Sequence, residues 1–473
     1  MSDSQSIEAT RLLATWATTV SNQWNPKVRA IAEQELEDTV AAAIAGSGDV
    51  GCAKLRSLCE SGDIPVVGQR AGSSALWATL HNGTAAHAME LDDMFFVAGG
   101  HFGCAVIPAI WATAWQRDAS LDDMLDAIIV GMEVMARVGM GIGRPHILRG
   151  WHGTQTLGAI AAAAACARLM KFDVDGMTHA ISAAVSQAAG LKVQFGTDIK
   201  PVHAGFAAKS GWLAAQLAAA GLQGSAVALE GKAGFGDLYA GNLPADWSNM
   251  MQTHDVPLVV ETHGIAFKLY PNCASAHRCI DAVRAIQNEV GFSAEDVAQV
   301  VGFVGPVNYE NLKYGNPTTP RQAMFSLPYA VASALRYGTV ELADFTPQAV
   351  NDPETRKYLP LVDMQVTPLA ETEKETATNL FAHKAIVKLN NGQIHEKEIK
   401  YARGMAQNPL STSERLAKFK QCTEGIVPAT QLKELQALLK SPWGQRSRSL
   451  LSLLQFEAKV DDGSRFCRVA KRQ

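Results

Sequence analysis

The chain has 473 residues, of which 47% are apolar and 19% are charged, and its formal net charge is −4. This length and composition predict a globular protein of two or three domains with a large buried core. Because no block of Lys and Arg stands out, the sequence argues against nucleic acid as a partner. A small anionic molecule can still bind in a local basic pocket.

The sequence also argues against a membrane or secreted protein. No stretch approaches the roughly 18 apolar residues of a membrane span. The start of the chain lacks the basic stretch and apolar run that open a secretory signal. The eight cysteines form no CxxC pair and lie mostly in apolar surroundings, which is typical of reduced thiols. We therefore expect a cytoplasmic protein.

The first part of the chain, to about residue 265, is predicted to be mostly helical. Pro26 opens a helical stretch that ends at Gly46, the usual placement of these residues at helix ends. Ser120 precedes apolar residues at helical spacing that continue to Val138. Further helices are predicted over 157–170, 175–189 and 204–220. Their Ala and Gly content favours a core of closely packed helices.

The composition changes near residue 290. Residues 297–307 are rich in Val and predict a strand. Residues 385–389 and 394–399 flank a turn sequence and predict a hairpin. Residues 321–336 are predicted to be helical, with a kink at Pro328. Residues 267–403 therefore predict a smaller α+β domain.

The chain is predicted to become helical again after residue 403. Ser411 and Glu414 form a capping box that starts a helix. The remaining tail is predicted to be helical to about Leu454 and could return to the first domain. The predicted fold class is mainly α.

The candidate site residues lie in short polar interruptions of this apolar sequence. They are His152, Lys200 and His277, together with the acidic residues Glu90, Asp92 and Asp93 that precede His101. Imidazoles, an ammonium and a few carboxylates suit binding and proton transfer on a polycarboxylate, since such groups form charge-assisted hydrogen bonds and titrate near neutral pH.

Two other interpretations of these motifs are less favoured. The glycines of 139–143 lack the third glycine and the preceding strand of a dinucleotide fingerprint, so they indicate a helix end. His101, Cys104 and His152 match no zinc spacing, so we predict no metal.

His152 is predicted to lie at a helix start, because Gly153 follows it and a helix begins at about Thr154. The backbone field there favours anions and disfavours an imidazolium. A neutral imidazole that shuttles a proton for a bound carboxylate fits this position. Of the imidazoles, the sequence therefore favours His152 for proton transfer, with His101 next.

Several segments in the same order resemble the MmgE/PrpD family. They are 81–93, 150–153, 200–208, 268–271 with His277, and 408–411. The resemblance implies a large all-helical domain built from both chain ends, 1–266 and 404–473, and an inserted α+β lid domain, 267–403. It also implies a cofactor-free homodimer whose pocket lies between the two domains. Pocket positions of the family fall on His101, His152, Lys200, His277 and Tyr329.

The resemblance leaves three hypotheses about function open. The first is a lyase that removes water or carbon dioxide from a short di- or tricarboxylic acid, as family members do with 2-methylcitrate and cis-aconitate. The second is an isomerase that exchanges a proton without elimination, as in epimerisation of iminodisuccinate. The third is a catalytically inactive carboxylate-binding protein. In the first two, Lys200, His152 and His277 would bind carboxylates while a histidine exchanges a proton.

Overall fold

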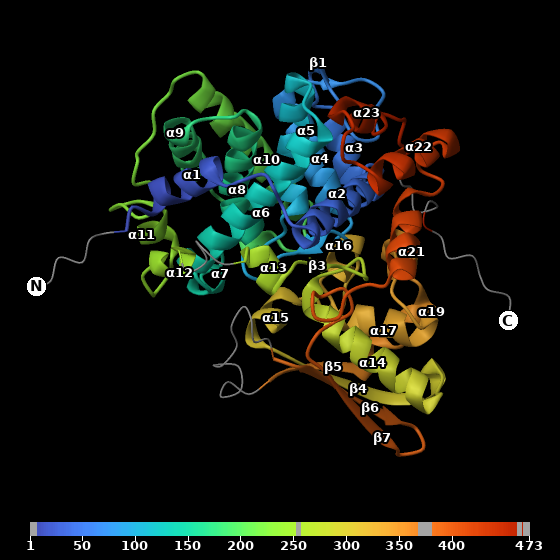
Figure 1. The fold of residues 1–473 in the computed structure, drawn as a ribbon. Coiled ribbons are helices and arrows are strands. Elements are labelled where there is room, and N and C mark those ends of the chain that lie inside the picture. Colours follow the sequence, from blue (N-terminus) through green and yellow to red (C-terminus); the bar gives the residue numbers. More distant parts are fainter. Residues whose placement is uncertain (1–6, 252–256, 368–380, 461–465, 467–473) are drawn as a thin grey trace, which may run out of the picture.

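The computed structural model describes residues 7–251, 257–367, 381–460 and 466 (Figure 1). Helices dominate these residues, and the predicted mainly α class is confirmed. The long helices of the first part are α1 (Ala9–Thr19), α2 (Pro26–Gly46), α4 (Ala75–Ala88), α5 (Gly103–Arg117), α6 (Leu121–Ile142), α8 (Gly153–Leu169), α9 (Val174–Val185) and α10 (Ile199–Ala219). Shorter elements between them are α3 (Val50–Arg56), β1 (Ser61–Ile64), α7 (Pro145–Leu148), α11 (Phe235–Tyr239), α12 (Trp247–Met251) and α13 (Val259–His263).

The centre of the helical part is α10, which packs along both α4 and α8. Small residues make this contact possible: a Cβ on Gly205 would lie 2.1 Å from the carbonyl oxygen of Leu80. α8 begins at Gly153, next to the start predicted at about Thr154. α10 begins at Ile199, earlier than the predicted range 204–220, which places Lys200 in its first turn.

A four-stranded sheet lies at the opposite end of the molecule (Figure 1). Its strands are β4 (Val297–Val304), β5 (Val362–Val366), β6 (His383–Leu389) and β7 (Ile394–Ile399), in the order β5-β4-β6-β7. β4 and β5 are parallel, whereas β6 pairs antiparallel with β4 and with β7, so the predicted hairpin is present. The helices α14 (His277–Val290) and α17 (Leu327–Tyr337) pack against this sheet.

The predicted kinked helix over 321–336 is instead two helices, α16 (Pro320–Ala323) and α17. Pro328 lies in the first turn of α17, where the backbone N–H that proline lacks has no helical partner in any case. The Ser326 hydroxyl caps this turn by accepting from the backbone N–H of Tyr329 at 3.2 Å. Proline therefore starts a helix here and does not bend one. Other short helices are α15 (Pro306–Asn311), α18 (Pro347–Val350) and α19 (Pro353–Arg356).

The C-terminal tail packs against the first helices of the chain. It contains α21 (Thr412–Thr423), which begins at the predicted capping box, α22 (Ala429–Lys440) and α23 (Ser447–Ser452). α21 and α22 contact α2, and α23 contacts α5. β2 (Asp93–Met94) pairs with β3 (Ala266–Phe267) close to the first predicted domain boundary. The division at residues 266 and 403 itself stays a prediction.

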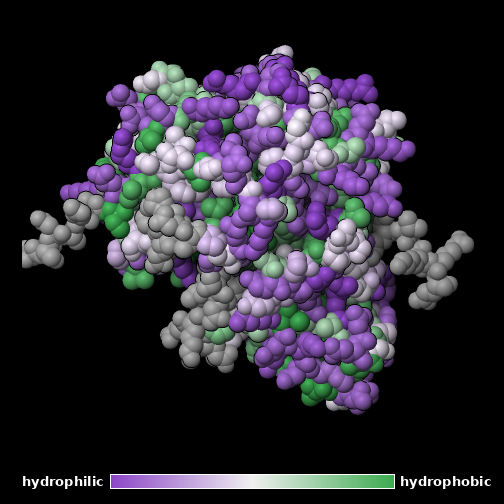
Figure 2. Space-filling model, in the orientation of Figure 1, coloured by the Kyte–Doolittle hydropathy of each residue, from purple (hydrophilic) through white to green (hydrophobic). Residues whose placement is uncertain are grey.

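The surface in Figure 2 is largely hydrophilic, with apolar side chains in small separate groups. The predicted homodimer stays a prediction. In the described part of the chain, every helix is too short or too polar to cross a bilayer.

Candidate active site

The loop between α4 and α5 carries the acidic segment, whose three carboxylates are buried. Glu90 has a left-handed backbone with φ of 51°, which is uncommon outside glycine and is a recurring mark of functional loops. This turn brings Glu90 and Asp92 to the same buried region as His87, the last histidine of α4. His87 was missed as a site residue in the sequence, although it lies inside the motif 81–93.

Two carboxylates and two ammonium groups pair in this region. Nζ of Lys200 contacts Oε1 of Glu90, and Nζ of Lys268 lies 3.1 Å from Oε2 of Glu90 and 3.4 Å from Oδ1 of Asp92. All four side chains are at most 4% exposed. Burial alone would raise the pKa of Glu90, but the two ammonium groups outweigh it and hold that pKa well below its usual range. Lys200 is thus already paired within the protein.

His87 connects the two pairs. Its Nδ1 lies 2.7 Å from Oδ2 of Asp92, and its Nε2 lies 2.5 Å from Nζ of Lys200. Burial is the main reason why the pKa of His87 is lowered. A neutral ring that donates from Nδ1 to Asp92 and accepts at Nε2 from Lys200 satisfies both contacts.

One ring nitrogen of His101 has no hydrogen-bond partner among the described residues. Its Nδ1 donates to the backbone carbonyl of Asp93 at 2.5 Å and lies 3.3 Å from Oδ2 of Asp92. No described residue hydrogen bonds to its Nε2, and the residue lines a cavity. Burial lowers the pKa of His101 well below its usual range, although the Asp92 carboxylate opposes this. The Nε2 lone pair is therefore available to a molecule in the cavity.

His152 lies at the start of α8, as predicted, but both of its ring nitrogens are occupied. The Thr154 hydroxyl, which accepts from the backbone N–H of His101 at 3.1 Å, also hydrogen bonds with Nε2 of His152 at 2.9 Å. Nδ1 of His152 lies 2.9 Å from Nδ1 of His203, and one of these two nitrogens carries the hydrogen of that bond. Burial, followed by the positive charge of Lys200, lowers the pKa of His152.

Four predicted site residues, Asp92 among them, are buried outside the lining of the cavity. The carboxylate of Asp93 accepts from the backbone N–H groups of Phe102 and Gly103, each at 2.9 Å, and burial with the neighbouring Asp92 raises its pKa to about 8. His277 bonds through Nε2 to the carbonyl of Asn272 at 3.2 Å. The hydroxyl of Tyr329 donates to the carbonyl of Asp344. Their predicted role with substrate stays a prediction.

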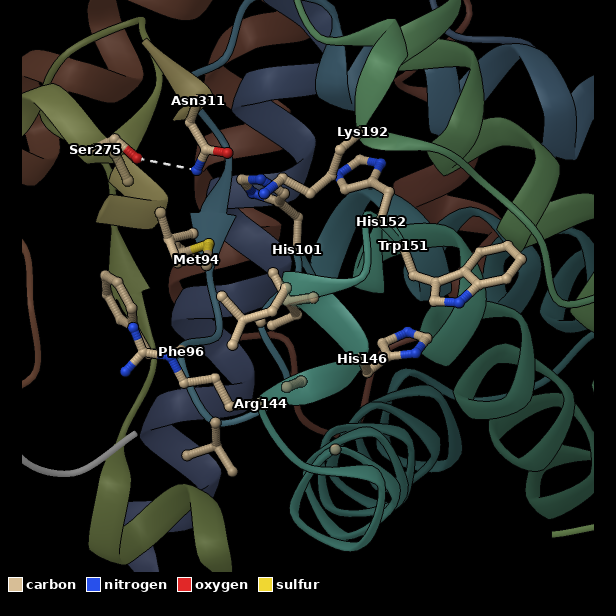
Figure 3. A pocket seen from close by; sticks show the side chains of 18 of the residues that line it. Met94, Phe96, His101, Arg144, His146, Trp151, His152, Lys192, Ser275 and Asn311 are labelled. Atoms are coloured by element: carbon tan, nitrogen blue, oxygen red, sulfur yellow. Dashed lines mark hydrogen bonds between the residues drawn. The ribbon is translucent and has the colours of Figure 1, made fainter. Parts of the chain in front are cut away.

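The cavity beside the imidazoles has a volume of about 620 Å³ (Figure 3). We call the part lined by His101, His152, Lys192 and Lys200 the cationic end. Amide and hydroxyl groups also face the cavity from the segment around α15: Asn308 and Asn311 donate to the Ser275 hydroxyl at 3.1 and 3.2 Å. No local motif in the sequence marks Lys192 or these three residues, so they were not predicted as site residues.

Three imidazole nitrogens are close enough to hold a metal ion. One nitrogen each from His87, His101 and His152 lies within 4.8 Å of the others, as do ligand atoms of His87, Asp92 and Cys104. However, Nζ of Lys200 lies 2.5 Å from Nε2 of His87, and its positive charge opposes a second cation. The metal-free site stays a prediction.

Comparisons with known proteins agree with one another. Residues 11–248 match the MmgE/PrpD N-terminal domain, and residues 270–441 match the MmgE/PrpD C-terminal domain. The chain is 28% identical to cis-aconitate decarboxylase of Mus musculus over 404 residues, which covers 80% of each chain. It is 26% identical to that of Homo sapiens over 80% of this chain and 79% of the relative. A cis-aconitate decarboxylase-like protein of Aspergillus oryzae is 26% identical over 76% and 78%.

Proposed function

The chain belongs to the MmgE/PrpD family, and from this premise we propose that it is a cofactor-free lyase that decarboxylates a tricarboxylic acid of the cis-aconitate type. The relatives named above support the decarboxylase over the dehydratase and the isomerase. One observation carries the proposal: Nε2 of His101 has no hydrogen-bond partner in the part of the chain that the structure describes, and His101 lines a cavity that ammonium groups also line.

The cationic end binds the substrate carboxylates. Lys192, with a pKa lowered by burial, lines the cavity with its ammonium group, and the amides of Asn308 and Asn311 offer hydrogen-bond donors. The ammonium of Lys200 also lines the cavity, although Glu90 already partly neutralises it. Positive charge placed before the reaction stabilises the anion that develops during it.

Decarboxylation needs a proton donor at carbon. The C–C bond to the leaving carboxylate breaks, its electron pair shifts the neighbouring double bond, and negative charge develops beside a second carboxylate. A proton from Nε2 of His101 then forms the new C–H bond, and carbon dioxide leaves. The bound carboxylates favour the imidazolium, so His101 takes up this proton from solvent when the substrate binds. Asp92, 3.3 Å from Nδ1, stabilises the charged ring.

This assignment reverses the order that the sequence favoured. His152 already uses both nitrogens, whereas His101 uses one. To accept or donate a proton, His152 must first give up its bond with Thr154 or His203. We therefore propose His101 as the proton donor and His152 as the residue that holds Thr154, and through it the backbone of His101, in place.

The test is incubation of the purified protein with cis-aconitate in deuterated water, followed by NMR, with and without a chelator. We expect one deuterium at the newly protonated carbon and release of carbon dioxide, unchanged by the chelator. His101→Gln should lower kcat by on the order of 100-fold or more, and His152→Gln by less. Loss of water from a citrate-type acid would indicate a dehydratase, and deuterium exchange without a new product would indicate an isomerase. Binding without any reaction would contradict all three enzymatic hypotheses.

A further inference from the structure

The cavity carries a second group of polar side chains away from the cationic end. We call this group the distal end: Arg144, Asn249 and His263. In Figure 3, Arg144 and Phe96 lie away from Lys192 at the cationic end. Apolar side chains such as Phe96 line the same part of the cavity, and they offer an anion no hydrogen bonds. An anion in this part of the cavity therefore binds to the distal end.

Three segments around α6 contribute the distal end. Arg144 lies in the turn between α6 and α7. α12 and α13, which carry Asn249 and His263, both pack against α6. The backbone N–H of Asp246 donates to the carbonyl of Gly141 at 2.8 Å, which holds the start of α12 beside the last turn of α6. The packing of these helices therefore brings the three side chains to one cavity.

The distal end offers hydrogen-bond donors that suit a carboxylate. The guanidinium of Arg144 is a planar fork of N–H groups, which matches the two oxygens of a carboxylate. Nδ1 of His263 hydrogen bonds with the Thr262 hydroxyl at 2.8 Å, and no described residue hydrogen bonds to its Nε2. The amide of Asn249 adds a neutral donor. All three side chains are half-buried, so salt screens their contacts with an anion less than it would on an open surface.

The charges that line the cavity favour a polyanion. Among the described lining residues, Glu90 is the only carboxylate, and it is paired with Lys200. Fixed positive charge comes from a larger set of lining residues: Arg144, Lys192, Lys200 and Arg278. A cavity of about 620 Å³ is in the range that holds drug-sized ligands, and a short tricarboxylic acid would fill only a part of it. Both the space and the charge thus allow a further carboxylate.

We propose that the distal end is a second carboxylate-binding site of the cavity, which binds a carboxylate additional to those of the reacting acid. This inference rests on the proposed function, because the reacting acid must occupy the cationic end. The additional carboxylate comes either from a second acid molecule or from a substrate with four carboxylates that spans the cavity. The chemistry at the distal end is the same for both sources, and the test separates them.

Calorimetry tests the distal end without requiring turnover. Propane-1,2,3-tricarboxylate has no double bond, so it cannot lose carbon dioxide by the proposed route. If a second molecule is the source, this acid should bind at two sites per chain. If one longer molecule is the source, the same acid with a carboxypentyl substituent should bind about tenfold more tightly than the acid with a hexyl substituent of equal length. A single site for the unsubstituted acid, together with equal affinities of the two substituted acids or a preference for hexyl, would overturn the inference.

Two variants localise the additional carboxylate. Arg144→Gln should weaken the second binding event, or the advantage of carboxypentyl over hexyl, by about tenfold, because it removes hydrogen bonds between charged groups. His263→Leu should act in the same direction. Arg149→Gln is the matched control, since it removes a positive charge from an exposed residue at the end of α7, outside the cavity lining.

The outcomes for the distal end and for the proposed function are separate. Unaltered binding in both Arg144→Gln and His263→Leu would place the additional carboxylate elsewhere and contradict the inference. A loss in Arg149→Gln equal to that in Arg144→Gln would do the same, because it would reflect net charge alone. Turnover of cis-aconitate is measured apart from calorimetry, and its absence would contradict the proposed function and not the distal site.

Discussion

The two imidazoles of the cationic end differ in which ring nitrogens are engaged. His152 bonds to Thr154 and His203, whereas Nε2 of His101 has no partner among the described residues. The residue type and the helix start that the sequence revealed are correct for His152. Neither the residue type nor the helix start shows which groups the ring nitrogens contact. The proposal of His101 over His152 as the proton donor therefore rests on the structure.

The role of His101 as an acid predicts a particular pH dependence. In the free enzyme, its pKa is lowered by burial and by Lys268, His87 and Lys200, against the effect of Asp92. The protonated form is therefore a small fraction at neutral pH and falls further as the pH rises. We expect kcat/KM to fall about tenfold per pH unit between roughly pH 7 and 8.5, whereas kcat falls less because bound carboxylates raise that pKa in the complex.

This profile separates an acid from a base. If His101 acted as a base, its neutral form would already dominate and kcat/KM would be level across the same range. The control is the residual activity of His101→Gln, whose kcat/KM should no longer fall as the pH rises. A level kcat/KM for the unmodified enzyme would rule out the assignment.

The buried pairs of Glu90 predict an effect on stability. Lys200→Met leaves Glu90 with Lys268 alone and the cluster with one excess negative charge. Removal of one partner from a buried pair costs roughly 3–5 kcal/mol. In Lys200→Met/Glu90→Gln, one carboxylate and one ammonium remain, so urea unfolding should show the double variant to be more stable than Lys200→Met alone. Equal stability of the two variants would mean that Glu90 and Lys200 are not coupled.

At the scale of elements, the start of α8 and the loop before α5 determine each other's position. A Cβ on Gly153 would lie 2.7 Å from the carbonyl oxygen of Gly99 and 2.9 Å from that of Ala98. Both contacts are with backbone, which cannot rotate away. This close approach is what sets His152 and His101 beside each other.

Gly153→Ala should therefore displace the loop that carries His101. We expect a loss in kcat of about tenfold or more, because small displacements of a catalytic group are costly, with a folded protein by circular dichroism. Gly315→Ala is the matched control, since a Cβ there meets nothing within 4 Å and its φ is not left-handed. Full activity of Gly153→Ala would show that the loop tolerates the shift.

At the scale of the whole molecule, Arg321 on α16 joins distant segments. Its guanidinium donates to the carbonyl of Ala88 at the end of α4 and pairs with Asp49 at 2.6 Å and Asp198 at 3.2 Å. The first part of the chain contributes all three partners. Arg321 therefore fixes the end of α4, which precedes the acidic loop, relative to Asp198, which precedes α10.

Arg321→Gln should lower the free energy of unfolding by roughly 1.5–3 kcal/mol, because hydrogen bonds to charged groups are lost. Arg11→Gln is the control: the Arg11–Asp175 pair has a similar distance of 2.8 Å, but its side chains are 47% and 67% exposed. An exposed pair of this kind should change stability by less than about 1 kcal/mol. Denaturant unfolding of both variants checks the difference, and equal effects would contradict a linking role for Arg321.

The sequence by itself determined the features that depend on neighbours in the chain. Pro26, Ser120 and Ser411 mark helix starts because capping acts over a few residues. The motif segments indicated the family because each is a short run of neighbouring residues that can be recognised without knowing the fold. The position of His152 at the start of α8 follows from the glycine beside it.

The tertiary structure alone decided the features that depend on contacts between distant segments. Lys200 pairs with Glu90 across 110 residues, and Lys268 across 178. No local pattern specifies such contacts, so Lys200 looked like a free carboxylate ligand in the sequence. The cavity has the same origin: Met94, Ile142 and Ile147 look like ordinary core residues in the sequence, and only the packing of α6 and α7 against the loop after β2 leaves them around a cavity.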